Sequence, residues 1–182
     1  TDTMSRASTA FTESIKDAEE LLQHFDAINT KPPPANAEVL KRAALIMALT
    51  AWESYVEDRA AEALADRIAF ISGSPVAEFI TKKFNEEIKR LNNPNATKTK
   101  NLFMDYLGVD VTQYWEWSNM DIPKVRQCLD ELLAKRGDAA HRSRVSLNKT
   151  QNGHLVRRED LEKAIRFLRM LVEKSEKSFE KA

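Results

Sequence analysis

The segment at residues 135–142, with the sequence KRGDAAHR, holds two side chains suited to chemistry at a phosphate. Histidine titrates near pH ~6.5, so His141 is suited to accept and return protons at neutral pH. Arginine stays charged and offers paired planar donors, so Arg136 is suited to hold a phosphate and stabilise charge that grows on its oxygens. Asp138 lies between them and can orient either side chain. The segment therefore predicts a candidate site for proton transfer beside a bound anion.

Positive charge gathers around this pair, although the whole chain is formally neutral, with 28 Lys and Arg against 28 Asp and Glu. A neutral chain argues against a protein that coats nucleic acid through its overall field. Between residues 135 and 158, seven cations outnumber one anion, Asp138, which gives +6 there and −6 over the remainder. The seven are Lys135, Arg136, Arg142, Arg144, Lys149, Arg157 and Arg158. We therefore expect a local site for a polyanion.

Arg136 falls in register with the apolar stripe of its predicted helix. That stripe consists of Ile122, Val125, Leu129 and Leu132 or Leu133. A guanidinium in this register is costly unless it is paired or lines a cleft. On a regular helix, the five-residue step from Arg136 to His141 turns the side chain by about 140° and advances it by roughly 7.5 Å. Convergence of the two groups therefore requires that Gly137 bend or end the helix, or that a second subunit supply the opposite wall.

Structural roles remain open for the same residues. His141 and its neighbours can be cations at a helix C-terminus, where the macrodipole favours positive charge by roughly 0.3–1 kcal/mol each. Arg136 can form a structural salt bridge, for instance to Glu53 or Asp138. Glu53 either faces the motif from the rim of the buried face or belongs to a solvated face. Tyr55 could stack on a base, although core packing is its commoner role.

The elements that carry these residues are predicted to be helices. Four glycines and six prolines supply few of the tight turns that a β-sheet protein needs. Apolar periodicity predicts helices at about 8–28, 36–70, from 75 to about 91, 98–107, from 122 and from about 159. Ser8 or Thr9 is expected to cap the first helix and Gly108 to close the fourth. Residues 31–34 should form a polyproline spacer, and Asn152–Gly153 a tight turn, with a small hairpin as an option.

The chain is expected to form one domain over residues 8–182, preceded by a disordered N-terminus or expression remnant at residues 1–7. The single cysteine, Cys128, excludes an intramolecular disulfide and is expected to act as a small hydrophobe in a reducing, cytoplasmic setting. His24 has no metal-ligand spacing and is expected to be structural or exposed. Trp115 and Trp117 should bury their rings. We expect no metal, no cofactor, and no stretch that spans a membrane.

Two stretches resemble a known family. Arg136, four intervening residues and His141 match the R-x4-6-H motif of HEPN (higher eukaryotes and prokaryotes nucleotide-binding) ribonucleases. Residues 129–142, LDELLAKRGDAAHR, and 48–60, ALTAWESYVEDRA, are similar to the HEPN branch named for its association with ribosomal L-PSP endoribonucleases. The resemblance covers residues from about 37 to 179. The family often has Asn or another polar residue directly after the arginine, whereas this chain has Gly137, which leaves Asp138 as the only acidic residue in the motif.

The resemblance implies an all-α bundle of about five to six helices that forms a homodimer. It implies a metal-independent endoribonuclease that leaves a 2′,3′-cyclic phosphate, with a toxin–antitoxin or phage-defence role and an antitoxin or other partner protein. Arg136, His141 and Asp138 are the expected catalytic residues. Lys135, Arg142, Arg144 and Lys149 are expected to bind RNA, and Glu53 and Tyr55 to support the site.

Two other functions stay open. The chain could be a catalytically silent HEPN module that binds RNA or a nucleotide, or that dimerises with a partner enzyme. It could also be a structural helical adaptor, in which case Arg136→Met should stabilise the fold. Loss of cleavage with retained RNA binding in His141→Ala separates the nuclease from the silent module.

Overall fold

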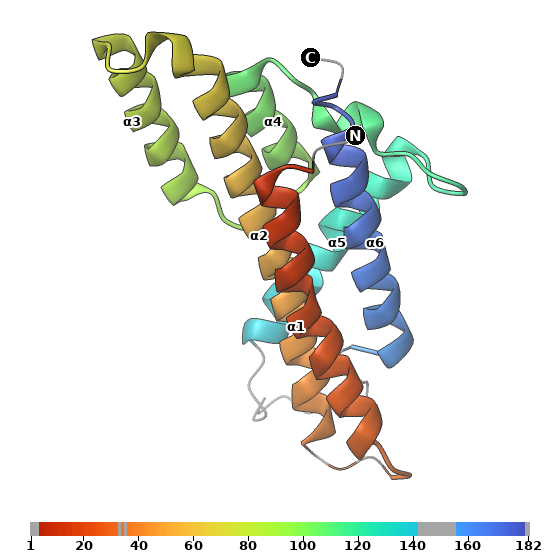
Figure 1. Ribbon diagram of the computed structural model, residues 1–182. Helices are drawn as coiled ribbons and strands as arrows, with labels where there is room; N and C mark the ends of the chain where they lie inside the picture. Colours follow the sequence, from red (N-terminus) through yellow and green to blue (C-terminus); the bar gives the residue numbers. More distant parts are fainter. Residues whose placement is uncertain (1–3, 33, 35, 142–155, 181–182) are drawn as a thin grey trace.

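The computed structural model describes residues 4–32, 34, 36–141 and 156–180, and this part of the chain is helical with no β-strand (Figure 1). Its elements are α1 (Arg6–Ile28), α2 (Ala37–Ile68), η1 (Ala69–Ile71), α3 (Pro75–Arg90), α4 (Ala96–Leu107), η2 (Val111–Tyr114), α5 (Ile122–His141) and α6 (Arg158–Glu176). The two η elements are short 3₁₀ helices. The predicted all-α class and the predicted bundle of about five to six helices are confirmed, with six α-helices in the described residues.

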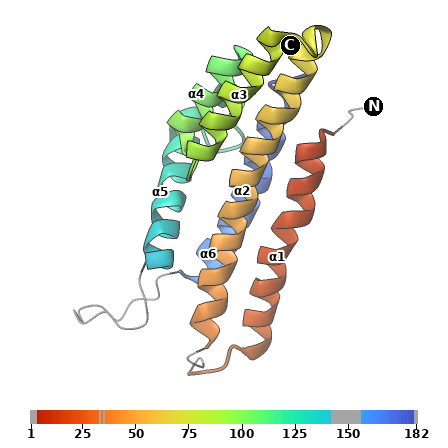
Figure 2. The ribbon, with the colours of Figure 1, turned by 90° about the vertical axis from the view of Figure 1, so that its left-hand side faces the viewer.

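Helix α2 is the central element, with 32 residues. It runs antiparallel to α1, and the two form a long hairpin (Figure 2). Small side chains let the two backbones approach closely, and α2 buries several of them: Ala44, Ala48, Ala51, Ala60 and Ala63. The stripe of α1 that packs there is Phe11, Ile15, Ala18, Leu22 and Phe25. Helices α5 and α6 cover other sides of α2, so that its buried residues form the middle of the core (Figure 1).

Helix α3 lies beside the C-terminal half of α2 and buries little of itself (Figure 1). Only Ala77 and Phe84 are buried on it, and Phe84 packs edge-on against Tyr106 of α4 with ring centroids 5.1 Å apart. Val76 and Phe79 stay exposed at its N-terminal end, next to the exposed Phe70 of η1. The main core therefore depends on the other five helices.

Several helix ends follow their predicted signals. Ser74 caps α3 and Pro75 opens it, and Gly108 closes α4 in the left-handed region with φ 67°. The Asp121 side chain accepts a hydrogen bond of 3.0 Å from the backbone N–H of Lys124 at the start of α5. The predicted cap of α1 was wrong: Ser5, not Ser8 or Thr9, accepts the N–H of Ser8.

The start of α1 also corrects the predicted domain boundary. The helix begins at Arg6, and Ala7 is buried, so two residues assigned to a disordered N-terminus belong to the bundle. The expected burial of Trp115 is confirmed, since its ring is fully buried and its indole N–H donates to Ser175 at 2.9 Å. Trp117 is only half-buried.

Candidate functional site

Arg136 lies in a polar cluster that joins α5, α2 and the loop between α3 and α4. Its Nη1 atom lies 2.7 Å from Oε2 of Glu53 and 2.8 Å from Oδ1 of Asn93. Its Nη2 atom lies 3.4 Å from the hydroxyl of Thr50. The side chains of Arg136 and Glu53 are 20% and 18% exposed, so the pair sits at the rim of the core, where solvent and a ligand have access. The salt bridge to Glu53, one of the two structural partners suggested for Arg136, is confirmed. The guanidinium is therefore paired, although it lies in register with the apolar stripe of its helix.

The geometry of α2 explains why two of its residues reach Arg136. Thr50 and Glu53 stand three positions apart, which places them on neighbouring turns of one helix face. On α5, Arg136 follows Leu129 and Leu132 on the face that packs against α2, so its side chain extends toward that pair. The ion pair therefore follows from the docking of two amphipathic helices.

The third partner of Arg136, Asn93, comes from a loop that is held firmly in place. The indole N–H of Trp52 donates to the carbonyl of Pro94 at 2.9 Å, and the side chain of Asp130 accepts the N–H of Ala96 at 3.0 Å. Asn93 itself adopts φ 45°, a left-handed conformation that asparagine tolerates better than most residues. Its backbone N–H donates to Oε1 of Glu53 at 3.0 Å. Asn93 therefore contacts both members of the ion pair.

Two donors of the guanidinium make no hydrogen bond to a described residue. Arginine has five N–H donors, and both on Nη1 are engaged by Glu53 and Asn93, while one on Nη2 points to Thr50. The Nε–H and the second Nη2–H make no hydrogen bond to any residue within the described ranges. In arginine, the Nε–H and the neighbouring Nη2–H form a fork that can bind two oxygens of a phosphate or carboxylate.

The charge next to this fork is mixed. Lys135, one of the predicted RNA-binding residues, is exposed on α5 beside Arg136. On α2, Glu57 lies one turn beyond Glu53, and burial, followed by repulsion from Glu53 and Asp58, raises the pKa of Glu57. Glu53 orients the guanidinium and offsets part of its positive charge. The exposed cation of Lys135 restores some of the attraction for an anion.

Helix α5 continues through Gly137 to His141, so the alternative in which Gly137 bends or ends the helix was wrong, and the alternative of a second subunit stays a prediction. A side chain at Gly137 would meet open space, so packing does not require glycine there. On a continuous helix, positions 136 and 141 are separated by about 140° around the axis. The side chains of His141 and Asp138 lie outside the described residues, as do Arg142, Arg144, Lys149 and the predicted turn at 152–153.

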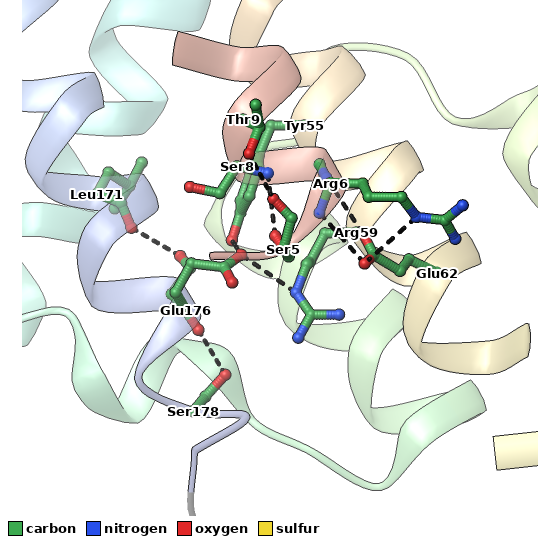
Figure 3. A network of polar contacts seen from close by, with 12 residues as sticks. Ser5, Arg6, Ser8, Thr9, Tyr55, Arg59, Glu62, Leu171, Glu176 and Ser178 are labelled. Atoms are coloured by element: carbon green, nitrogen blue, oxygen red, sulfur yellow. Dashed lines mark hydrogen bonds and ion pairs between the residues drawn. The ribbon is translucent and has the colours of Figure 1, made fainter. Parts of the chain in front are cut away.

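Tyr55 does not belong to the Arg136 cluster, so its predicted supporting role was wrong and the core-packing alternative holds. Its ring is 1% exposed, and its hydroxyl donates to Oε1 of Glu176 at 2.7 Å. The same oxygen accepts a hydrogen bond of 3.1 Å from Nε of Arg59, and these contacts link α2 to α6 (Figure 3). Two steps along α2 turn a side chain by about 200°, so Tyr55 and Glu53 occupy opposite sides of that helix.

The sequence reading missed Thr50 and Asn93. A helical wheel of α2 could have placed Thr50 on the face of Glu53. Nothing local in the sequence links Asn93 to Arg136, 43 positions away. Its only local signal was the run Asn92–Asn95 around Pro94, which was interpreted simply as a helix break.

The other candidates have ordinary surroundings. His24 is exposed on α1, as expected, and Cys128 is half-buried with its pKa raised by burial. Within the described residues, no three His, Cys, Asp or Glu side chains gather as metal ligands. None of the described helices is long and apolar enough to cross a membrane.

Comparison with known proteins gives one match. No curated protein and no solved structure matches the chain significantly. The sequence model of the RiboL-PSP-HEPN family, by contrast, matches residues 12–181, which include all of α2, α5 and α6. Since this match spans nearly the whole helical bundle, the chain belongs to the RiboL-PSP-HEPN family.

Proposed function

We propose that the protein is an endoribonuclease that cuts RNA by attack of a ribose 2′-hydroxyl on the adjacent phosphate. The P–O2′ bond forms and the P–O5′ bond breaks, which leaves a 2′,3′-cyclic phosphate and a free 5′-hydroxyl. The observation that carries the proposal is the fixed guanidinium of Arg136, whose Nε–H and one Nη2–H make no hydrogen bond to a described residue, in a chain of a HEPN family.

Arg136 would bind the scissile phosphate through these two donors and stabilise the charge that develops on its oxygens. Glu53 and Asn93 would act as positioning residues, because they contact the guanidinium and leave the phosphate to it. His141 would take the proton from the 2′-hydroxyl, and a histidine would give one to the leaving 5′-oxygen. Asp138 would orient one of these groups.

A homodimer would supply two copies of each residue. Since α5 is continuous, positions 136 and 141 lie about 140° apart around its axis, so the histidine of a second copy is the better candidate to complete the site. Lys135, Arg142, Arg144 and Lys149 would bind the flanking RNA backbone, and such contacts fix the strand without reading its sequence. A toxin or phage-defence effector controlled by a partner protein fits this activity.

The rival function is a catalytically silent module that binds RNA or a nucleotide, or that dimerises with a partner. The salt bridge to Glu53 favours it to a degree, because a paired arginine can also be purely structural.

The test is cleavage of end-labelled single-stranded RNA in the presence of a chelator. We expect cyclic-phosphate 3′ ends with RNA, and no cut in a DNA strand of the same sequence, which lacks the attacking hydroxyl. His141→Ala should abolish cleavage while RNA binding persists. His24→Ala, the matched control on the exposed side of α1, should cleave like the wild type. Cleavage by His141→Ala at the wild-type rate, or none by the wild type, would rule out the proposed mechanism.

A further inference from the structure

A second candidate site lies between α5 and α6, apart from the Arg136 cluster. It is a cavity of about 440 Å³, within the range of roughly 300–1,000 Å³ typical of small-molecule sites. Its apolar lining comprises Leu45, Trp117, Met120, Cys128, Leu132, Val156, Leu161, Ala164, Phe167 and Met170. Neither Glu53 nor Asn93 contributes to it.

A short, well-fixed turn contributes two of the lining residues. Trp117 and Met120 exchange two backbone hydrogen bonds, of 3.0 and 2.7 Å, which fix the backbone that carries their side chains. The Trp117 ring packs against Phe167 of α6 with centroids 5.6 Å apart. Cys128 and Leu132, one turn apart, form the α5 wall. A half-buried tryptophan on an apolar wall offers contact area that is still open to a ligand.

The charged lining residues are predominantly basic. Lys135, Lys163 and Arg166 line the cavity together with a single acid, Asp160, and all four are exposed. No ion pair links any of these three cations to a residue in the described parts of the chain. Three cations against one anion give the rim a positive potential, while the interior is apolar.

We propose that this cavity binds a small amphipathic anion, specifically a medium-chain acyl carboxylate. The acyl chain would lie between Leu132 and Phe167, and the carboxylate would sit among Lys163, Arg166 and Lys135 at the rim. Burial of the chain supplies affinity, and the charged rim selects the anion and its orientation. The proposal is independent of RNA cleavage, because Lys135 is the only residue that the two sites share.

A nucleobase fits this cavity less well than an acyl chain. The edge of a base carries donors and acceptors that lose hydrogen bonds to water when they are buried. Away from the charged rim side chains and the Trp117 ring, the side chains of the described lining offer only sulfur atoms as hydrogen-bonding groups, those of Cys128, Met120 and Met170, and these are weak. An alkyl chain needs no such partners.

Cys128 gives a direct readout, because it is the only cysteine of the chain. Its rate of reaction with Ellman's reagent would be measured with decanoate added below its micelle concentration. Decanoate should slow the reaction in a saturable manner. Decan-1-ol, which has the same chain without the charge, should protect more weakly, and uridine monophosphate should not protect.

Substitutions at the rim test the role of charge. Lys163→Glu combined with Arg166→Glu should weaken decanoate binding by roughly tenfold or more, where tenfold corresponds to ~1.4 kcal/mol. Lys174→Glu makes the same change on α6 outside the cavity and should leave affinity unchanged. Ala164→Leu should reduce binding by filling the space, and its thermal unfolding would show whether the fold is retained.

Four results would overturn the proposal: no protection of Cys128 by decanoate, equal affinity in the rim double variant, equal protection by decan-1-ol, or better protection by uridine monophosphate. The last would indicate a nucleotide site. None of them bears on the His141→Ala cleavage test, so the two proposals can fail separately.

Discussion

The ion pair between Arg136 and Glu53 joins residues 83 positions apart and connects α5 to α2 with Nη1 and Oε2 only 2.7 Å from each other. It links the guanidinium of Arg136 to the packing of the core, because the carboxylate that orients this guanidinium stands directly after the fully buried Trp52. Changes at Glu53 should therefore alter both the stability and the activity of the protein.

Arg136→Met should destabilise the fold, in contrast to the stabilisation expected for a purely structural adaptor. Methionine leaves the largely buried Glu53 without its cation, which should cost about 1–3 kcal/mol. Adding Glu53→Leu should recover much of this loss, because both polar groups are then removed. Urea unfolding of the two single variants and the double variant would give the coupling free energy. Additive effects would mean that the pair contributes nothing to stability.

A comparison of Asn93→Gly with Asn93→Ala should separate the effect of losing the carboxamide from the effect of straining the backbone at position 93. Both lose the acceptor 2.8 Å from Arg136, so both should lower cleavage. Glycine accepts φ 45°, whereas alanine is strained there by roughly 1–2 kcal/mol, so Asn93→Ala should be the less stable variant. Activity assays and thermal unfolding would be compared. Normal cleavage by Asn93→Gly would show that the carboxamide does not position Arg136.

Tyr55→Phe should affect stability at alkaline pH without affecting cleavage. Burial, followed by the nearby Glu176, raises the pKa of Tyr55 well above its usual value near 10.0. The neutral phenol therefore stabilises the folded state at neutral pH, and this contribution is lost as the pH rises above the unfolded pKa. Phenylalanine does not ionise, so the variant should lose less stability between neutral and strongly alkaline pH. Parallel alkaline curves for both proteins would contradict this assignment.

Helix positions could be predicted from the sequence because their signals are local. Apolar steps of three and four residues located most of the α-helices in the described residues, and Ser74–Pro75, Gly108 and Asp121 marked ends that the structure confirms. The start of α1 was misjudged because Ser5, Ser8 and Thr9 can all cap, and only tertiary packing distinguishes them. Ala7 is buried, and its backbone N–H donates to Glu62 of α2 at 3.1 Å, which fixes the earlier start.

The candidate site was predictable only in part. The register of Arg136 on an apolar stripe indicated a buried partner, and Glu53 was named as one possibility. Asn93 could not be predicted, because its position depends on how the 92–95 loop docks against Trp52 and Asp130. An interruption of α5 at Gly137 was one of two alternatives, but a single glycine costs only about 1 kcal/mol within a helix, and the flanking residues outweigh that cost.

The loop that carries Asn93 is bonded to Trp52, a residue with no exposed surface. Through that loop and Glu53, the guanidinium of Arg136 is held in one orientation before any anion arrives. A free arginine side chain loses about 2 kcal/mol of rotamer entropy when a ligand immobilises it. In this protein, folding has already imposed most of that ordering, so an incoming phosphate would meet donors that are preorganised for it.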